Sequence, residues 1–443
     1  MKKKDLKPIV QGDKKVIRGW VMYDWSNSVY QLTITSAIFP IYYGTMTSKG
    51  DDFTVSFFGI EIINTVLYSL AIAVSYLIVA VLSPILSSMA DYTGRRKGFM
   101  RAFTWLGATG CALLFFFNEN NIEFGIITFI IATIGYCGSI VFYNSFLPVI
   151  AAPEDQDRIS ARGYAMGYLG GVILLLFNLT MILKPGWFGF EPDSSLPARI
   201  SFITVFLWWI GFSSITFSRL PKYTLRKRSQ KAQLFLNGYR ELQKVFHFVN
   251  KSRQLKIYLL GFFFMMMGLI TVMFMATSFG EKEIGLKDEV LIPTLLIIQL
   301  VGMAGAWFFA WLSGRIGNLK SLAITLISWT LICYGAYYIT NATGFIAAAF
   351  FIGLVMGGSQ ALARSTYSKM LPETTDHTSF FSFYDVMEKV ATAAGTFSFG
   401  IIEAITGSMR YSVIAIGVFF LIGLVFMLLL LKRNTAPIKS SLS

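Results

Sequence analysis

The sequence predicts an all-α membrane protein whose twelve transmembrane helices form two bundles of six, related by a pseudo-two-fold axis along the membrane normal. Of the 443 residues, 55% are apolar and only 14% are charged, a balance typical of a chain that crosses a membrane many times. Apolar runs of about 20 residues, the length of a helix that spans a bilayer, recur along the whole sequence. A short polar motif after the fourth run recurs after the tenth, which indicates two related halves.

The expected spans are separated by breaks that carry turn-forming or charged residues. The break at 91–97 contains Gly94 before two arginines, and the break at 184–186 reads Lys-Pro-Gly. Such residues interrupt helices and mark loops. We expect the spans at residues 18–43, 62–89, 99–118, 124–150, 160–183, 198–219, 255–279, 289–313, 319–340, 343–371, 379–406 and 410–432.

The positive charges predict how the chain is oriented. With the N-terminus in the cytoplasm, about 30 of the Lys and Arg residues fall in cytoplasmic segments and about 6 on the opposite side, as the positive-inside rule requires. We therefore expect an integral, multi-pass membrane protein with both termini in the cytoplasm. The net charge of +14 is spread over several loops, so we expect contact with membrane lipids and no nucleic-acid partner.

The longest expected cytoplasmic segment divides the chain into its two halves. Its apolar residues recur in steps of four and three, which predicts an amphipathic helix on the inner membrane surface. These apolar residues are Phe235, Tyr239, Leu242, Phe246 and Val249. We therefore expect an N-terminal segment, a first bundle, this linker, a second bundle and a tail, at residues 1–17, 18–219, 220–254, 255–432 and 433–443.

Two pairs of short motifs relate the halves. PEDQDRIS at 153–160 and PETTDHTS at 372–379 share Pro, Glu, Asp and Ser at identical spacing, each between a span that ends in the cytoplasm and the next span. ADYTGRRK at 90–97 and SGRIGNLK at 313–320 form a weaker pair, each after the second span of its half. Repeats in the same orientation predict two bundles that face each other across a site near the bilayer midplane.

The first span carries polar residues that a helix surrounded by lipid does not tolerate. One stripe of this helix contains, at i, i+3, i+4, i+7 and i+11, the residues Asp24, Asn27, Ser28, Gln31 and Thr35. An unpaired charge at membrane depth costs from a few to more than about ten kcal/mol. Asp24 is therefore expected to pair with Arg364 or Arg162 as a structural carboxylate, or to bind solute or protons.

A second polar stripe, in the eleventh span, contains at the same spacing Asp385, Glu388, Lys389, Thr392 and Thr396. We expect Glu388 either to exchange a proton, because burial disfavours its charged form, or to form a static salt bridge with Lys389 or with another span. The tenth span adds Gln360 and Arg364. Arg364 is expected either to bind a solute carboxylate bidentately or to pair with Asp385 or Asp24.

Two spans carry small residues at every fourth position. Gly163, Gly167 and Gly171 fall on one face of the fifth span, and Gly353 and Gly357 fall on one face of the tenth. Small side chains let helix backbones approach closely, so we expect these faces to be packing surfaces, with sliding during transport as the alternative.

The break after the second span reads SSMADYTGRR at 87–96. It resembles the loop signature of the major facilitator superfamily, usually written GxxxD(R/K)xGRR. Gly94 permits a tight turn, and Asp91 can accept charge-assisted hydrogen bonds from an arginine or from the end of an opposing helix. We expect a gate, rather than a plain basic turn, that holds the two bundles together on the cytoplasmic side and consists of Asp91, Gly94, Arg95 and Arg96.

Four further stretches resemble one group within that superfamily. They are YDWSNSVY at 23–30, FYNSFLP at 142–148, ISARGYAMGYLGG at 159–171 and GGSQALARSTYSKMLP at 357–372. They are similar to the signatures of the "unknown major facilitator" group, the bacterial relatives of the fungal vacuole effluxers that export amino acids during autophagy. The resemblance covers nearly the whole membrane domain. It implies the major facilitator fold and a transporter in the inner membrane of a bacterium, with amino acids as the suggested class of solute.

The resemblance also implies where the functional residues lie. In this fold, spans one, four, seven and ten line a central cavity, and spans five and eleven flank it. A small polar or zwitterionic solute is then expected to contact Asp24, Asn27, Gln31, Tyr136, Asn144, Gln360 and Arg364. The candidates for coupling transport to protons are Glu388, Asp24 and Asp385. A functional monomer is the state that the superfamily implies.

The sequence argues against several other classes of protein. It has no GxxxxGK[ST] phosphate-binding loop, so we expect secondary active transport by alternating access, without ATP or another cofactor. Only two histidines occur, both outside the expected spans, so we expect neither a metal site nor an enzyme. The remaining alternatives are a transporter of sugars, organic acids or drugs, and a non-transporting receptor on the same scaffold.

Overall fold

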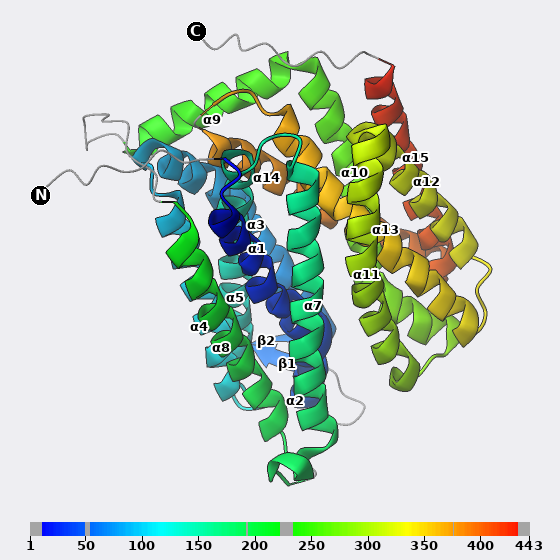
Figure 1. The fold of residues 1–443 in the computed structure, drawn as a ribbon. Helices are drawn as coiled ribbons and strands as arrows, with labels where there is room; N and C mark the ends of the chain where they lie inside the picture. The colour runs from blue at the N-terminus through cyan, green and yellow to red at the C-terminus, as the bar shows by residue number, and fades with distance from the viewer. Residues whose placement is uncertain (1–10, 49–53, 192–193, 222–233, 375, 433–443) are drawn as a thin grey trace, which may run out of the picture.

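The structure, a computed structural model, describes residues 11–48, 54–191, 194–221, 234–374 and 376–432 (Figure 1). The expected tail at 433–443 and the first ten residues lie outside this described part. Ten of the described helices are long and apolar enough to cross a membrane. Two further helical stretches, 14–47 and 377–406, are equally long but carry the two polar stripes. Each half therefore contains six long helices, in agreement with the expected fold class.

The first half contains the helices of the N-terminal bundle and a small antiparallel hairpin. The sequence analysis predicted no hairpin here and began the second span at residue 62, whereas the helix begins at Asn64. In chain order the elements are α1 (Lys14–Val29), η1 (Tyr30–Ala37), α2 (Ile38–Thr47), β1 (Thr54–Phe57), β2 (Ile60–Ile63), α3 (Asn64–Thr93), α4 (Arg96–Leu113), η2 (Leu114–Phe116), α5 (Ile122–Asn144), α6 (Leu147–Ile150), α7 (Gln156–Leu183), η3 (Pro185–Phe188) and α8 (Leu196–Arg219).

The second half begins with the linker helix and continues with the C-terminal bundle. Its helices start within a few residues of the expected spans, because turn residues and capping side chains mark their ends. Ser252, for example, accepts a hydrogen bond from the amide of Leu255 at the start of α10. In chain order the elements are α9 (Leu234–Lys251), α10 (Arg253–Ile284), α11 (Asp288–Ile316), α12 (Asn318–Ala336), α13 (Ala342–Met370), α14 (His377–Thr406) and α15 (Met409–Leu431).

Helix α9 lies across one end of the two bundles, and the hairpin lies toward the opposite end of the N-terminal bundle (Figure 1). Val245 and Val249 of α9 are buried, and the ring of Phe246 lies 6.0 Å from the ring of Phe383 in α14. The helix therefore packs against α3, α10 and α14. Of the predicted apolar face, Val249 takes part in this packing, whereas Phe246 is 59% exposed. We call this end of the molecule the α9 face and the opposite end the hairpin face.

The first long helix changes its winding half-way. It starts at the α9 face as α1, continues as the π-helix η1 and reaches the hairpin face as α2. The wider turns of a π-helix are uncommon and recur at functional sites. Gln31 of the predicted polar stripe lies in η1, and the backbone carbonyl of Thr35 accepts a hydrogen bond of 3.1 Å from the hydroxyl of Tyr68 in α3.

Small residues allow helices to meet closely both between the bundles and within them. Between the bundles, α7 packs against α11 and α13, and α3 packs against α14. Part of the α7 contact consists of three buried alanines, Ala161, Ala306 and Ala361. Within the C-terminal bundle, a Cβ added to Gly357 would collide with the backbone of Gly302 in α11. The prediction that the glycines of the tenth span form a packing surface is confirmed.

This packing predicts opposite effects for two glycine-to-alanine substitutions. Gly357→Ala should destabilise the fold by about 1–3 kcal/mol, because the new methyl group forces α11 and α13 apart. Gly335→Ala in α12 is the matched control: no atom lies within 4 Å of its added Cβ, so stability should stay equal or rise slightly through helix propensity. Thermal unfolding of the detergent-purified variants measures both effects, and equal melting temperatures would contradict the prediction.

Candidate functional site

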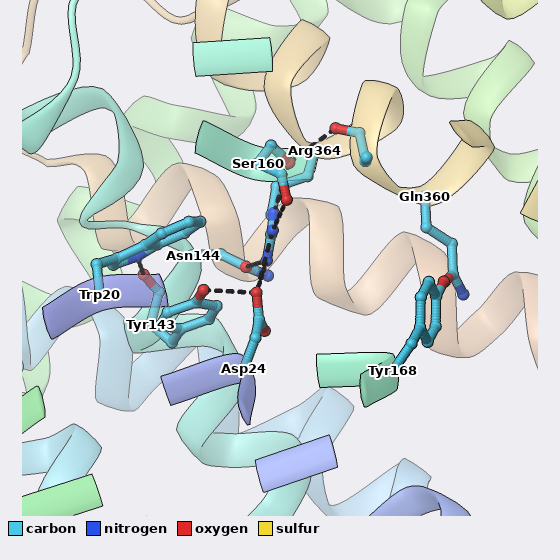
Figure 2. A network of polar contacts seen from close by, with 9 residues as sticks. Trp20, Asp24, Tyr143, Asn144, Ser160, Tyr168, Gln360 and Arg364 are labelled. Carbon is cyan, nitrogen blue, oxygen red and sulfur yellow. Dashed lines mark hydrogen bonds and ion pairs between the residues drawn. The ribbon is translucent and has the colours of Figure 1, made fainter. Parts of the chain in front are cut away.

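The centre of the contact between the bundles is a buried ion pair (Figure 2). Arg364 of α13 directs its Nη1 and Nη2 atoms to Oδ2 of Asp24 in α1, at 3.3 and 3.2 Å. Arg364 is 2% exposed and Asp24 is 6% exposed, so both charges are removed from solvent. Of the pairings that the sequence left open for these two residues, this is the one that forms.

The guanidinium of Arg364 also binds two other residues of the N-terminal bundle. Its Nε atom donates to Oγ of Ser160 at 2.9 Å, and Nη2 donates to the carbonyl of Ser160 at 2.8 Å. Nη1 donates to Oδ1 of Asn144 at 3.4 Å. Together with the two bonds to Asp24, these contacts use the five N–H donors of the side chain. A buried guanidinium is stable only when it is satisfied in this way.

Aromatic rings surround the ion pair. The guanidinium carbon of Arg364 lies 4.2 Å from the ring centroid of Tyr164 and 4.7 Å from that of Trp20, within the range of cation–π attraction. The hydroxyl of Tyr143 donates to Oδ2 of Asp24 at 2.7 Å. The Tyr143 carbonyl in turn accepts a 3.0 Å bond from Nε1 of Trp20. The rings exclude water and fix the carboxylate in place.

The predicted glycines of the fifth span make room for this arrangement. A Cβ added to Gly163 would collide with the Asp24 carboxylate and crowd Nη2 of Arg364, and one added to Gly167 would collide with Oγ of Ser28. Helix α7 can therefore lie against α1 only with glycine at these positions. The same helix brings Ser160, from the repeated motif at 153–160, to the guanidinium.

A second contact between the bundles involves Asp91, one of the predicted gating residues. Its Oδ2 atom accepts bonds from the backbone amide and the hydroxyl of Ser379, at 2.8 and 2.9 Å, in the first turn of α14. Its Oδ1 atom accepts from Nε of Arg96 at 2.6 Å. Gly94 ends α3 with a left-handed φ of 67°, which glycine adopts without strain. The fourth predicted residue, Arg95, is exposed at the start of α4.

A third contact, centred on Asp157 at the start of α7, was missed by the sequence analysis. Its Oδ2 atom accepts from Nζ of Lys369 at 2.7 Å and from Oγ of Ser313 at 3.0 Å. Its Oδ1 atom accepts from Nδ2 of Asn318 at 2.6 Å. The signal was present, because Asp157 belongs to one repeated motif while Ser313 and Asn318 belong to another, but the motifs were used only to relate the halves.

The predicted solute-contacting residues divide into two groups. Asp24, Asn27, Asn144 and Arg364 are buried. The others lie nearer the hairpin face and are more accessible: Gln31 is exposed, and Tyr136 and Gln360 are partly exposed.

Hydrogen bonds join the accessible residues in pairs. The hydroxyl of Tyr136 donates to Oε1 of Gln31 at 2.9 Å within the N-terminal bundle. The hydroxyl of Tyr168 donates to Oε1 of Gln360 at 2.6 Å across the two bundles, as Figure 2 shows beside the ion pair. The ring centroid of Tyr168 lies 6.1 Å from that of Tyr164. The accessible group is therefore connected to the buried ion pair through two tyrosines.

The stripe of α14 forms a separate charged cluster. Nζ of Lys389 lies 2.5 Å from Oδ1 of Asp385, and both side chains are buried. Lys389 also lies 5.7 Å from the ring centroid of Tyr76 in α3. Glu388 is partly exposed. The lysine therefore pairs with Asp385 and not with its neighbour Glu388. A static salt bridge between Glu388 and Lys389, one of the alternatives that the sequence left open, does not form in this structure.

The described residues contain no group of three or more His, Cys, Asp or Glu side chains that could hold a metal ion. Cys111, Cys137 and Cys333 are buried and separate. The chemistry of the described site is thus that of ion pairs, amides, hydroxyls and aromatic rings, which bind polar solutes by hydrogen bonds and charge.

Comparison with protein families identifies the family of the chain. Residues 12–436 match the family described as "Vacuole effluxer Atg22 like". The chain belongs to this family. It is 27% identical to the uncharacterized MFS-type transporter YxiO of Bacillus subtilis over 92% of its own length and 93% of the relative's. It is 24% identical to autophagy-related protein 22 of Kluyveromyces lactis, over 93% and 92% of the two chains.

Solved structures with the same fold include a transporter of the major facilitator superfamily. The structure superposes with a TM-score of 0.69 on the transporter FucP in the outward conformation, at 13% identity and over 95% and 99% of the two chains. It superposes with a TM-score of 0.71 on the human organic anion transporter MFSD10, at 11% identity and over 94% and 100% of the two chains. The major facilitator fold predicted from the repeats is confirmed.

The buried ion pair predicts a non-additive effect of substitutions. Asp24→Leu or Arg364→Met alone should destabilise the fold by about 3–5 kcal/mol, because each leaves an uncompensated buried charge. The double variant should regain much of the loss, since it leaves neither charge. Thermal or denaturant unfolding in detergent provides the measurement.

A matched control for this cycle is Arg158→Met. Arg158 pairs with Asp155 at the surface, where its side chain is 72% exposed, so the change should stay within about 1 kcal/mol. Additive losses in the double variant would show that the two buried charges do not depend on each other.

The other two interbundle contacts predict a change in accessibility. Asp157→Asn or Asp91→Asn should let the bundles part more often at the α9 face, because each removes a charged acceptor. Ala161, which is fully buried between the bundles, provides a reporter as Ala161→Cys. Its rate of maleimide labelling should rise several-fold in either variant. Asp155→Asn, at an exposed surface pair, should leave the rate unchanged; an equal rise there would contradict the prediction.

Proposed function

We propose that the protein is a proton-coupled secondary transporter that moves amino acids across the inner membrane of a bacterium by alternating access. Both termini, and with them the α9 face, lie in the cytoplasm in this proposal. The observation that carries it is the buried pair of Asp24 and Arg364. Each charge belongs to a different bundle, so the pair exists only while the bundles touch and must separate when they part on that side.

Three sets of polar contacts support a state that is closed toward the cytoplasm. They are centred on Asp24, Asp91 and Asp157, and each joins the two bundles near the α9 face. On the other side of the ion pair, Gln31 is exposed and Tyr136 is partly exposed. In our proposal a solute enters from the hairpin face in this state and leaves toward the cytoplasm, or the reverse, after the contacts exchange.

The two groups of polar residues would then act in succession. Gln31, Tyr136 and Gln360 are positioned to contact a solute while the α9 face is closed. Once the bundles part there, the ion pair between Asp24 and Arg364 is broken, and each side chain can bind a charged group of the solute instead. Asn27 and Asn144 lie beside them. An arginine and an aspartate at this spacing suit the carboxylate and ammonium groups of one amino acid.

The carboxyl groups within the helices support proton coupling. Asp385 is neutralised by Lys389 and Asp24 by Arg364, which leaves Glu388 as the acid best placed to take up and release a proton as its surroundings change. The functional unit in this proposal is a monomer. The test below also distinguishes the alternatives, which are a transporter of sugars, organic acids or drugs and a receptor that does not transport.

The test of this proposal is a binding screen followed by a transport assay. Detergent-purified protein is heated with amino acids, dipeptides, sugars or organic acids at acidic and neutral pH. A ligand at a hundredfold excess over its Kd should stabilise the fold by about 2.7 kcal/mol. We expect amino acids to raise the melting temperature, and labelled amino acid to accumulate in liposomes when a proton gradient is imposed.

Variants separate binding from folding in this screen. Gln31→Ala and Gln360→Ala remove partly accessible side chains and should weaken binding several-fold while the melting temperature without ligand changes little. Gly335→Ala serves as the unaffected control. If only sugars or organic acids stabilise the protein, the proposed amino-acid substrate is wrong and that class takes its place. Binding without any accumulation in liposomes would favour a receptor.

A further inference from the structure

The carboxylate of Glu388 lies unpaired between the two bundles. No hydrogen bond or ion pair joins this carboxylate to another side chain in the part of the chain that the structure describes. The residue is nonetheless only partly exposed. A carboxylate in such a position has lost much of its hydration without gaining a partner, so it is a strong acceptor for a cation that arrives from outside the protein.

The basic side chains between the bundles are already occupied. Lys389 lies 2.5 Å from Asp385, and Arg364 donates all of its N–H groups to Asp24, Ser160 and Asn144. Neither is available to a solute while the α9 face is closed. Among the described residues, the accessible region between the bundles therefore offers negative charge, and its two cations, Lys389 and Arg364, are both paired.

Asp385 supplies a second acceptor one turn before Glu388. Its Oδ1 atom binds Lys389, but its Oδ2 atom is buried and has no hydrogen-bond partner within the described chain. Asp385 is 4% exposed. A buried acceptor without a partner destabilises the fold, and this cost is relieved by any donor that reaches it.

Three tyrosines on three helices of the other bundle lie within electrostatic range of Glu388. Its charge acts on the hydroxyl groups of Tyr76 in α3, Tyr136 in α5 and Tyr164 in α7. The remaining ionisable groups near it are Cys137, Tyr384, Asp385 and Lys389. Tyrosine faces attract ammonium groups through cation–π interaction, and their hydroxyl groups accept hydrogen bonds.

We infer that Glu388, with the rings of Tyr76, Tyr136 and Tyr164 and the free oxygen of Asp385, binds the ammonium group of the solute while the α9 face is closed. This inference deepens the proposed function and rests on it. It assigns recognition in this state to the amino group, because the cation that would bind a carboxylate, Arg364, is sealed in its ion pair. A compound with an amino group and no carboxylate therefore still binds, whereas one with a blocked amino group does not.

A proton competes with the ammonium group for the same carboxylate. When Glu388 is protonated it has no charge to offer, so acidification weakens binding of the solute. Release of the solute and uptake of a proton are thus linked at one side chain, and the linkage disappears when that side chain cannot titrate.

The experiment compares three forms of L-alanine and of L-leucine with the full-length protein in detergent. These are the free amino acid, the amide, which keeps the ammonium group and lacks the carboxylate, and the N-acetyl derivative, which lacks the ammonium group. Titration calorimetry should show that the amide binds within about threefold of the amino acid. The N-acetyl compound should bind at least about tenfold more weakly, because it cannot form the charge-assisted contact with Glu388.

Two charge-neutralising variants of α14 complete the experiment. Glu388→Gln should weaken binding of the free amino acids at least tenfold and abolish the pH dependence of what remains. Glu403→Gln removes the same charge from the same helix at a partly exposed pair with Lys282 and should leave affinity and pH dependence unchanged. Melting temperatures without ligand identify any variant that fails to fold, and the comparison of wild-type ligands does not depend on the variants.

The outcomes separate this inference from the proposed function. If the N-acetyl compounds bind as well as the free amino acids, or if the folded Glu388→Gln variant binds them with wild-type affinity and pH dependence, the ammonium site is overturned while amino-acid transport stands. If neither the free amino acids nor their amides bind, both the inference and the proposed cargo are overturned.

Discussion

The need to satisfy one buried guanidinium organises the middle of this molecule. Arg364 is 2% exposed, and a charge so far from water is tolerated only with a counter-charge and a full set of hydrogen bonds. Its partners come from α1, α5 and α7, whereas the arginine itself comes from α13. The requirement accounts for Gly163, which lets α7 approach, and for the aromatic rings that enclose the charges.

Buried ion pairs combine large opposing energies and leave a small net stabilisation. Desolvation of Asp24 and Arg364 offsets most of their attraction, so a second arrangement in which water or a solute replaces each partner differs by only a few kcal/mol. The ion pair of Asp157 with Lys369 is less buried and adds a smaller increment on the same side, whereas the side chain of Asp91 is fully buried in its contact with Ser379. Because these favourable and unfavourable energies nearly cancel, the contacts stabilise the state that is closed at the α9 face but still allow the bundles to part.

The sequence predicted the fold and both polar stripes, because helix periodicity and the motif repeat are local signals. It left the partner of Arg364 open, because Asp24 lies 340 residues away and only tertiary packing brings the two together. The partner of Lys389 could have been predicted from helix geometry. A lysine on a helix faces the residue four positions earlier, here Asp385, and not its immediate neighbour Glu388. The π-helical stretch at Tyr30–Ala37 was not predicted, since its composition does not distinguish it from the α-helix that was expected there.

The contacts at the α9 face have a polarity. The carboxylates, Asp24, Asp91 and Asp157, all belong to the N-terminal bundle, and the groups that reach across to them, including Arg364, Lys369 and Ser379, belong to the C-terminal bundle. If two N-terminal bundles met at this surface, their carboxylates would face and repel each other. If two C-terminal bundles met, their arginine and lysine side chains would do the same. The duplicated halves are therefore no longer interchangeable: each has diverged into the complement of the other, and neither can close against a copy of itself.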